Sequence, residues 1–508
     1  MVTKVFCLAC LGLKVSQVEI EVDIQKGLPG ISVIGLADEA VRESKHRVKS
    51  AIKNSGFEIP SKKIVINLAP ANIQKSGSHY DLAMALAWLN SNFQTNIDFQ
   101  KYYLIGELSL DGMIRPVDGI LPMVLKARED NKKIIIPCEN KQEASLVEGV
   151  QLYAAKDLKE VYNLLLNDTC IYWQKNGASY QNNISSYDID FNEVKGQQQA
   201  KRAIEIAVAG MHNILMIGPP GVGKSMLAAR IPTILPEMNR DEMIEVTKIH
   251  SIAGSLKKRK VPLITERPFR APHHTLSHIA LVGGGTRVMP GEITLAHHGV
   301  LFMDELPEFN RLALESLRQP LEKKEINIAR AQQHVTFPSN FLFVGAMNPC
   351  PCGYLLSKDK TCRCTSYQIQ KYRNKISGPL LDRIDIHIEL TNIGLESIFD
   401  KKEEKEGSKE IKKRIENTRS KQIERFDTSV QFNSQIKNKN LEKLCNLSQN
   451  AEKMLKKAVK YYNFSLRAYT KIIKVARTIA DLEDHNTIQE TDIAEAVQYR
   501  SLDKALWL

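Results

Sequence analysis

The chain contains the stretch Gly218-Pro219-Pro220-Gly221-Val222-Gly223-Lys224-Ser225, which fits the pattern G-x-x-x-x-G-K-[ST]. Glycines allow a backbone to curl so tightly that several N–H groups converge on phosphate oxygens. In such a loop the lysine reaches the β- and γ-phosphates, and the serine hydroxyl binds Mg²⁺. The stretch therefore predicts a site for a nucleoside triphosphate, with ATP and Mg²⁺ as the expected cofactors.

The segments on both sides of this loop have the composition that such a site needs. Residues 213–217 are apolar after Asn213, as in a buried parallel strand, and residues 225–230 are typical of a helix whose amino terminus faces the anion. This strand–loop–helix order disfavours the alternative of a glycine-rich turn without a ligand. The residues predicted to contact the nucleotide are Gly218, Pro219, Pro220, Gly221, Val222, Gly223, Lys224, Ser225 and Met226.

Composition limits the class of protein. The 508 residues, of which 43% are hydrophobic and 25% charged, are ordinary for a globular protein of several domains. No apolar run approaches the length of a membrane span, and the amino terminus lacks the features of a signal peptide. We therefore expect a cytoplasmic protein without a membrane partner. Nine cysteines, an odd number in a large chain, suit reduced thiols better than a disulfide framework.

The net charge of +12 is compatible with a polyanion such as nucleic acid as partner. The surplus is spread along the chain, so this signal is modest, and a role in solubility is the alternative.

The chain divides into segments by pattern. Residues 1–165 mix strands with helices and predict an α+β domain. Its expected strands are 18–24, 63–68 and 133–137, and its expected helices are 37–55 and 80–89. Residues 166–187 lack periodicity and predict a linker. Residues 188–395 alternate strands and helices, which predicts a parallel sheet. Residues 396–508 are expected to be helical, with a solvated, salt-bridged helix over 401–425 and amphipathic helices over 469–482 and 491–499.

Hydrolysis of ATP needs more than the phosphate loop. The apolar strand predicted over 299–303 is followed by Asp304 and Glu305. We expect Asp304 to hold the Mg²⁺ shell and Glu305 to activate the attacking water. The strand over 341–347 ends at Asn348, an amide placed to position the water or to sense the γ-phosphate. The alternatives are an acidic turn and a turn asparagine. A last strand is predicted over 384–390.

These motifs together resemble the AAA+ ATPases of the helix-2-insert clade, which includes magnesium-chelatase ATPase subunits and MCM helicases. The pattern is most similar to the ComM/YifB magnesium-chelatase-like family, and the resemblance covers essentially the whole chain. Its marks are Pro268-Phe269-Arg270-Ala271-Pro272-His273-His274, Met303-Asp304-Glu305-Leu306-Pro307-Glu308-Phe309, Asn348-Pro349-Cys350-Pro351-Cys352-Gly353, Gly378-Pro379-Leu380-Leu381-Asp382-Arg383-Ile384-Asp385 and Ser465-Leu466-Arg467-Ala468.

The resemblance implies an α/β AAA+ P-loop NTPase core over 188–395 and a C-terminal helical lid over 396–508. By position, Arg383 resembles the arginine finger that reaches a neighbouring subunit's γ-phosphate, and Arg467 resembles the sensor arginine of the lid. The alternative for each residue is an ordinary arginine in a salt bridge. A finger that acts on a neighbour requires a ring of identical subunits, usually a hexamer in this class.

The segment between Lys224 and Asp304 is long for a bare core. It contains a basic run at 255–260, then Arg267 and Arg270, His273 and His274, and a glycine-rich stretch at 283–287. Such a composition suits an element that contacts a phosphate backbone, and in the clade this region is the helix-2 insert. Residues 323–337 predict a β-hairpin similar to the clade's pre-sensor hairpin. The alternative is a set of solvated surface loops, and metal binding by the paired histidines is disfavoured.

Four of the nine cysteines, Cys350, Cys352, Cys362 and Cys364, lie in one short stretch. Their C-x-C spacing is less common for zinc than C-x-x-C. Both a four-cysteine Zn²⁺ site and reduced or redox-active thiols fit this pattern.

The first segment resembles the Lon-protease-like domain with the ribosomal S5 domain 2 fold, and the C-terminal domain of the recombination protein RadA. The protease uses a serine that a lysine deprotonates. Here the corresponding positions carry His79 and Leu121, although Ser76 and Ser78 lie close by. We expect this domain to be non-proteolytic.

The resemblance thus implies an ATP-hydrolysing ring that acts on single-stranded or branched DNA, as a branch-migration helicase or translocase in recombination or competence. The alternative is a magnesium-chelatase-like or MoxR-like remodeller of protein complexes, and an ATP-dependent protease is the least favoured function. The basic insert and the net charge favour the DNA motor.

Overall fold

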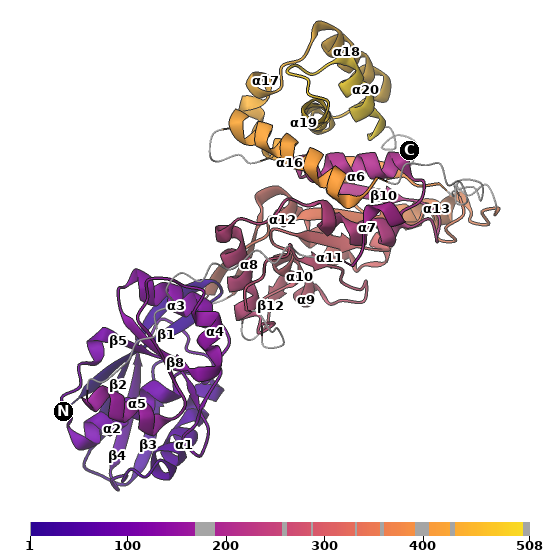
Figure 1. Cartoon of the computed structure of the whole chain (residues 1–508). Coiled ribbons are helices and arrows are strands. Elements are labelled where there is room, and N and C mark those ends of the chain that lie inside the picture. Colours follow the sequence, from indigo (N-terminus) through magenta and orange to yellow (C-terminus); the bar gives the residue numbers. More distant parts are fainter. Residues whose placement is uncertain are drawn as a thin grey trace.

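The computed structural model describes residues 2–167, 188–256, 262–285, 288–330, 333–355, 360–391, 406–426 and 432–500. Figure 1 shows an amino-terminal domain at one end, a central sheet domain and a group of C-terminal helices. Residues 166 and 167 end a helix, and the rest of the predicted linker lies outside the described residues. Within the described ranges, no helix is both long and apolar enough to cross a bilayer.

The amino-terminal domain is built on a mixed sheet in the order β1-β2-β4-β3, in which only the β3–β4 pair is parallel. Alternate residues of β2 are buried, as the period of two predicted. A second, parallel sheet has the order β5-β8-β9. The bounds are β1 Thr3–Leu11, β2 Lys14–Gln25, β3 Gly30–Ile34, α1 Glu39–Asn54, β4 Lys63–Ala69, α2 Asp81–Phe93, β5 Tyr102–Leu104, β6 Glu107–Leu108, β7 Ile114–Arg115, α3 Ile120–Glu129, β8 Lys133–Pro137, α4 Lys141–Ala144, β9 Leu152–Ala155 and α5 Leu158–Asn167.

The central domain contains a five-stranded sheet in the order β11-β14-β17-β10-β18, and every neighbouring pair is parallel. This confirms the predicted parallel sheet, and four of its strands lie inside the ranges predicted from sequence. The strands are β10 Ile214–Ile217, β11 Phe269–Arg270, β14 Val300–Met303, β17 Leu342–Met347 and β18 Ile386–Glu389.

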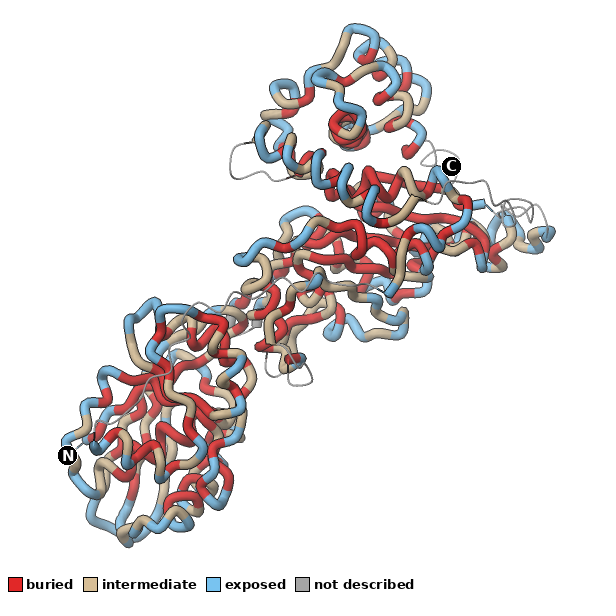
Figure 2. Tube along the Cα trace, in the orientation of Figure 1, coloured by how far each residue is buried: buried red, intermediate tan, exposed pale blue. Residues whose placement is uncertain are grey.

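Helices cover both faces of this sheet, which explains why β10, β14 and β17 are continuously apolar. In β10, Ile214 and Met216 enter a core shared with α6 (Gln198–Gly210), α7 (Lys224–Ile234) and the C-terminal helices. Leu215 and Ile217 enter the opposite core, with α11 (Arg311–Ser316) and α12 (Arg318–Lys323). Figure 2 shows the resulting buried centre of the domain.

The long segment before β14 forms short elements beside the sheet: α8 Arg240–Ile252, α9 His278–Val282, β12 Gly283–Gly284, β13 Met289–Pro290 and α10 Glu292–Leu295. The hairpin predicted over 323–337 is present as β15 Glu325–Arg330 and β16 Gln333–Pro338, which pair antiparallel. After β17 come α13 Ser366–Arg373 and α14 Gly378–Leu381.

The C-terminal part is helical, as predicted: α16 Ser408–Arg425, α17 Leu441–Leu444, α18 Gln449–Tyr462, α19 Leu466–Leu482 and α20 Glu490–Gln498. The solvated helix expected over 401–425 differs from the structure, since α16 buries Ile411, Ile415 and Gln422 on one face. That face packs on α6 and α7, and the high charge of the other face had obscured the helical spacing of these residues.

The amino-terminal domain contacts the central domain along α8 and at the β15–β16 hairpin. Between α3 and α8, Gly119 N donates to Ser251 O at 3.1 Å, and Ser251 Oγ donates to Glu143. The β1–β2 turn also packs on the β15–β16 hairpin. Gly12 in this turn has a φ of +59°, and a Cβ there would lie only 2.3 Å from Val335 Cγ1. The hairpin is therefore held by a domain outside the ATPase core.

Candidate ATP site

The phosphate loop of residues 218–223 joins β10 to α7. Gly221 and Gly223 have φ values of +83° and +94°, a conformation that L-residues with side chains rarely adopt. Nothing lies within 4 Å of the Cβ positions at these two glycines, so backbone conformation rather than crowding requires them. Helix α7 begins at Lys224, so its first N–H groups face the loop, as anion binding requires.

Lys224 is held inside this loop. Its Nζ donates to Gly218 O at 2.7 Å, to Pro219 O at 2.9 Å and to Asn348 Oδ1 at 3.1 Å. Burial lowers the pKa of Lys224, although the carboxylates of Asp304 and Glu305 act in the opposite direction. The ammonium group of Lys224 therefore lies inside the phosphate loop, within hydrogen-bond distance of Asn348.

Asp304 completes the group. It follows β14, and its Oδ2 accepts a hydrogen bond from Ser225 Oγ at 2.6 Å, while its Oδ1 accepts one from Glu305 N at 2.8 Å. A serine hydroxyl beside a carboxylate supplies the hard oxygen ligands that Mg²⁺ prefers. The ends of β10, β14 and β17 thus bring Lys224, Ser225, Asp304 and Asn348 together at the carboxyl edge of the sheet, where α/β folds bind ligands.

Glu305 has a neighbour that the sequence did not predict. His274 Nδ1 lies 3.3 Å from Glu305 Oε2, and both side chains are partly exposed. The sequence places His274 in the basic insert and disfavours it as a metal ligand, but it gives no sign of a contact with Glu305. The parallel pairing of β11 with β14 explains the contact, because residues that follow the two strands emerge at the same edge. The arrangement suits a residue that positions the carboxylate of Glu305.

Replacing His274 with alanine is expected to lower kcat for ATP hydrolysis by about tenfold, because Glu305 loses the imidazole that lies against its carboxylate. The KM for ATP should not change, since His274 contacts Glu305 and not the phosphate loop. His274→Gln, which keeps a side-chain donor, should recover part of the rate. His273→Ala is the matched control, because His273 Nδ1 pairs instead with Thr275 Oγ1 at 2.9 Å. Equal losses in both alanine variants would contradict the assignment.

The two arginines of the predicted site lie at the other edge of the sheet. Arg383 precedes β18, whose first residue, Ile386, is paired with Ile214 at the start of β10. The backbone carbonyl of Arg383 accepts a hydrogen bond from Asn213 Nδ2 at 3.0 Å, so this turn sits at the amino end of β10. The phosphate loop follows the carboxyl end of the same strand. Arg383 therefore does not join Lys224 within one chain.

Arg467 lies on the same side as Arg383. Its Nη1 is 3.8 Å from Asp382 Oδ2, and its side chain is 63% exposed. Arg383 donates to Pro379 O at 2.7 Å and forms an ion pair with Glu322. Both arginines line one hollow that further cations also line, namely Lys323, Lys324, Lys437, Lys471 and Lys474. The phosphate loop therefore lies at the carboxyl end of strand β10, whereas Arg383 and Arg467 lie at its amino end.

Two arginines of the insert have structural partners. Arg267 Nη1 donates to His298 O at 2.8 Å, and its side chain is 9% exposed. Arg270 forms a two-pronged ion pair with Glu292, at 2.5 and 2.6 Å. Backbone carbonyls and Glu242 hold Arg267, and Glu292 holds Arg270, so both arginines have partners within the chain. Their contact with a phosphate backbone stays a prediction. The basic run at 257–260 and Arg287 lie outside the described residues.

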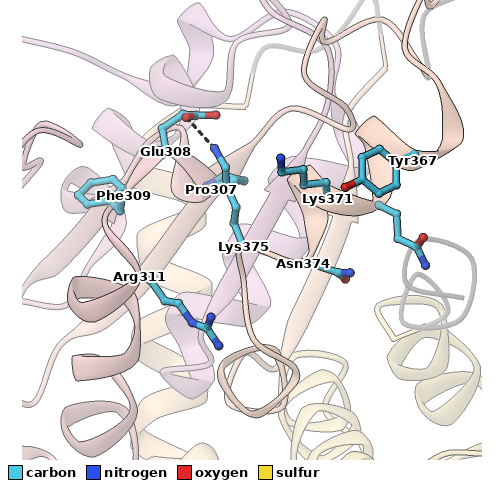
Figure 3. A pocket seen from close by; sticks show the side chains of 9 residues that line it. Pro307, Glu308, Phe309, Arg311, Tyr367, Lys371, Asn374 and Lys375 are labelled. Carbon is cyan, nitrogen blue, oxygen red and sulfur yellow. Dashed lines mark hydrogen bonds and ion pairs between the residues drawn. The ribbon is translucent and has the colours of Figure 1, made fainter.

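A surface hollow lies between α13 and residues 307–311, which follow Asp304 and Glu305 in the sequence (Figure 3). Arg311, Lys371 and Lys375 line it, and Lys375 Nζ is 3.0 Å from Glu308. None of the predicted catalytic residues contributes to it, so it is distinct from the phosphate site.

Comparisons with known proteins cover all three parts of the chain. The models described as "Magnesium chelatase, subunit ChlI", "Subunit ChlI of Mg-chelatase" and "Magnesium chelatase, subunit ChlI C-terminal" match residues 190–398, 20–140 and 405–500. The competence protein ComM of Haemophilus influenzae is 39% identical over 505 residues, 99% of this chain and 98% of the relative. The chain belongs to the ComM/YifB family of magnesium-chelatase-like AAA+ ATPases. YifB of Escherichia coli is 38% identical over 499 residues, 98% of this chain and 97% of the relative.

Membership in the ComM/YifB family implies the use of ATP and Mg²⁺, in agreement with the residues gathered around the phosphate loop. A weaker similarity, 26% identity over 166 residues or 30% of this chain, connects it to Lon protease 2 of Bacillus subtilis.

Proposed function

We propose that this ComM/YifB family member is a ring-forming ATP-driven motor, a hexamer that moves on DNA and drives branch migration in recombination or natural transformation. The observation that carries the proposal is the separation of Lys224 from Arg383 and Arg467 by the length of strand β10. When a second copy docks the surface that carries its Arg383 and Arg467 against the phosphate loop of the first copy, these groups come together. ATP then lies between two subunits, and its cleavage is coupled to their relative movement.

Each residue at this interface has one role. Lys224 and the loop N–H groups bind the phosphates, and Ser225 with Asp304 holds Mg²⁺, which neutralises phosphate charge when bound. Glu305 accepts a proton from the attacking water, and Asn348 orients that water or the γ-phosphate. Arg383 stabilises the charge of the transition state in the neighbouring site, and Arg467 contacts the γ-phosphate there.

DNA is the favoured substrate for three reasons. The relative from Haemophilus influenzae is named a competence protein, and competence concerns the uptake of DNA. The chain has a net charge of +12. Finally, a hollow in the amino-terminal domain is lined by lysines of α1 and of the segment before β4, namely Lys45, Lys49, Lys53 and Lys62, together with His46. Such a group of flexible cations suits phosphate contacts that carry no sequence information.

ATP hydrolysis by the purified chain is expected to rise when DNA is added, and this stimulation should fall as salt rises, because binding releases counterions from DNA. The measurement compares single-stranded, duplex and four-way-junction DNA over a salt series, with mass photometry in the presence and absence of nucleotide. Activity that is indifferent to DNA at every salt concentration would favour a remodeller of protein complexes. A protein that stays monomeric in saturating ATP and hydrolyses it at full speed would contradict the ring.

A variant of the basic hollow tests whether its lysines contact DNA. Lys49→Ala with Lys53→Ala removes two exposed cations and should flatten the salt slope by about 2, at 0.9 per phosphate contact, without changing hydrolysis in the absence of DNA. Lys4→Ala is the matched change, since Lys4 belongs to the same domain but is held by Glu19 at 2.6 Å.

The amino-terminal domain is non-proteolytic in this proposal, and it has the ribosomal S5 domain 2 fold. His79, at the position of the nucleophile, is buried, and its Nε2 lies 2.9 Å from Leu8 O. Leu121, at the position of the lysine, is fully buried, and Ser78 bonds to Glu107. The domain instead positions the β15–β16 hairpin through its β1–β2 turn.

A further inference from the structure

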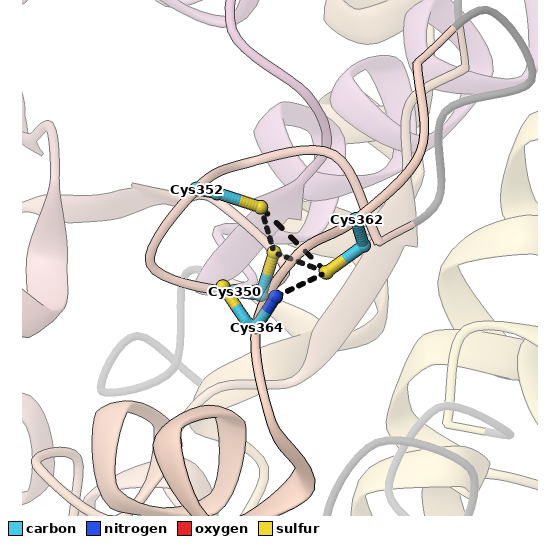
Figure 4. Close-up of side chains that lie close together, drawn as sticks. All are labelled: Cys350, Cys352, Cys362 and Cys364. Atoms are coloured by element: carbon cyan, nitrogen blue, oxygen red, sulfur yellow. Dashed lines mark hydrogen bonds between the residues drawn. The ribbon is translucent and has the colours of Figure 1, made fainter.

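The loop between β17 and α13 gathers four thiols. Its described residues form turns without helix or strand, and Cys350 is its buried thiol while the other three are half-buried. Figure 4 shows the four side chains pointing toward one another. The Sγ atoms are 3.4 Å apart for Cys350–Cys352, 3.7 Å for Cys350–Cys362 and 3.6 Å for Cys352–Cys362. The four candidate ligand atoms, including Cys364 Sγ, all lie within 4.8 Å of one another.

These separations fit a metal better than a disulfide. A disulfide requires sulfurs about 2.05 Å apart. Four thiolates bound tetrahedrally at the Zn–S length of about 2.3 Å are about 3.8 Å apart. The sequence supplies two C-x-C pairs in a loop without regular structure, and such a loop gains most from a metal that replaces a core.

The surroundings also suit a zinc tetrathiolate, which carries two negative charges. Arg363 lies between two of the cysteines in sequence. Arg373 on α13 donates to Pro349 O at 3.2 Å, directly before Cys350. These cations offset the charge of the site.

The cysteine loop touches the phosphate loop. A Cβ at Gly353 would lie 2.7 Å from Pro220 Cδ, so the backbone at Gly353 packs directly against the ring of Pro220. Asn348, which accepts the hydrogen bond from Lys224, lies only two residues before Cys350. Whatever fixes this loop also fixes one wall of the ATP site.

We propose that Cys350, Cys352, Cys362 and Cys364 bind a structural Zn²⁺ ion, which holds Asn348 and the Pro220 contact in place beside the nucleotide. The metal itself does not depend on the proposed motor function, whereas its effect on turnover rests on that function. The two parts are therefore tested separately.

The full-length chain, purified without a metal-binding tag, should contain about one zinc per chain by mass spectrometry of the metal. Cys352→Ser with Cys362→Ser should lose it, and Cys138→Ser, outside the loop, should keep it. Glu245, His297 and His298 form a second group of potential ligands, so His298→Ala must also keep the zinc. Wild-type protein without zinc, or zinc retained by the double serine variant, would overturn the proposal.

A measurement on the wild-type chain covers the case in which the serine variant does not fold. Exchange of the metal for Co²⁺ should give the absorption of a tetrahedral cobalt tetrathiolate, and a spectrum without sulfur-to-metal charge transfer would overturn the site. Removal of zinc should lower ATP turnover by up to about 100-fold, an effect of the size expected when a catalytic group moves by ~1 Å. Zinc-free protein with full turnover would overturn the contribution of the metal to the ATP site.

Discussion

Arg383→Ala is expected to lose ATP turnover by about 10³–10⁵-fold while it binds ATP as tightly as the wild type. The reason is the placement of this residue at the amino edge of the sheet, remote from the phosphate loop of its own chain. The guanidinium then acts only on charge that develops in a neighbouring subunit's transition state, and not on bound ATP. Turnover and the affinity for a fluorescent ATP analogue measure the two effects.

The same variant allows a test of action between subunits. Arg383→Ala and Lys224→Ala subunits are each expected to be inactive alone, and mixed rings should recover activity at interfaces that combine the intact Lys224 with the intact Arg383. An arginine that acted within its own chain would give no recovery. Glu322→Gln is the matched control, because it breaks the ion pair of Arg383 but keeps the arginine. Wild-type turnover in Arg383→Ala would refute the role of the residue as a finger.

The core was largely predictable from sequence because β10, β14 and β17 are buried on both faces and are therefore continuous apolar runs. The runs of β14 and β17 end at Asp304 and Asn348, the run of β10 leads into the phosphate loop, and the structure gathers Lys224, Asp304 and Asn348 at one end of the sheet. A parallel sheet alone produces this gathering, since all strands end on the same side.

Other features depended on contacts that no local pattern records. The proximity of His274 to Glu305 arises from the pairing of β11 with β14. Strand β11 has only two residues, which is too few to show the alternation of side chains by which a strand is predicted. Arg267 and Arg270 have the charge of a nucleic-acid contact, but their partners lie about twenty to thirty residues away along the chain. The buried face of α16 was hidden by the charge of its exposed face.

Lys224→Ala is expected to weaken ATP binding by about 10- to 100-fold, as loss of a charge-assisted hydrogen bond worth roughly 1.5–3 kcal/mol predicts. Its ammonium is buried in the phosphate loop and is held by two carbonyls and by Asn348. Among the residues that the structure describes, Lys224 is the cation bonded inside this loop, so its charge is not replaced in the variant. Titration with a fluorescent ATP analogue in Mg²⁺ measures the change.

Glu305→Gln separates binding from chemistry at the same site. It should keep the affinity for ATP and lose about 10²–10⁴-fold in turnover, because an amide does not accept the proton of the attacking water. Lys375→Ala is the matched control for charge, since this half-exposed lysine pairs with Glu308 in the neighbouring hollow. Its removal should change neither quantity. If Lys224→Ala bound ATP as tightly as Lys375→Ala, the triphosphate would have to bind elsewhere, and the arrangement of two subunits around one nucleotide would lose its basis.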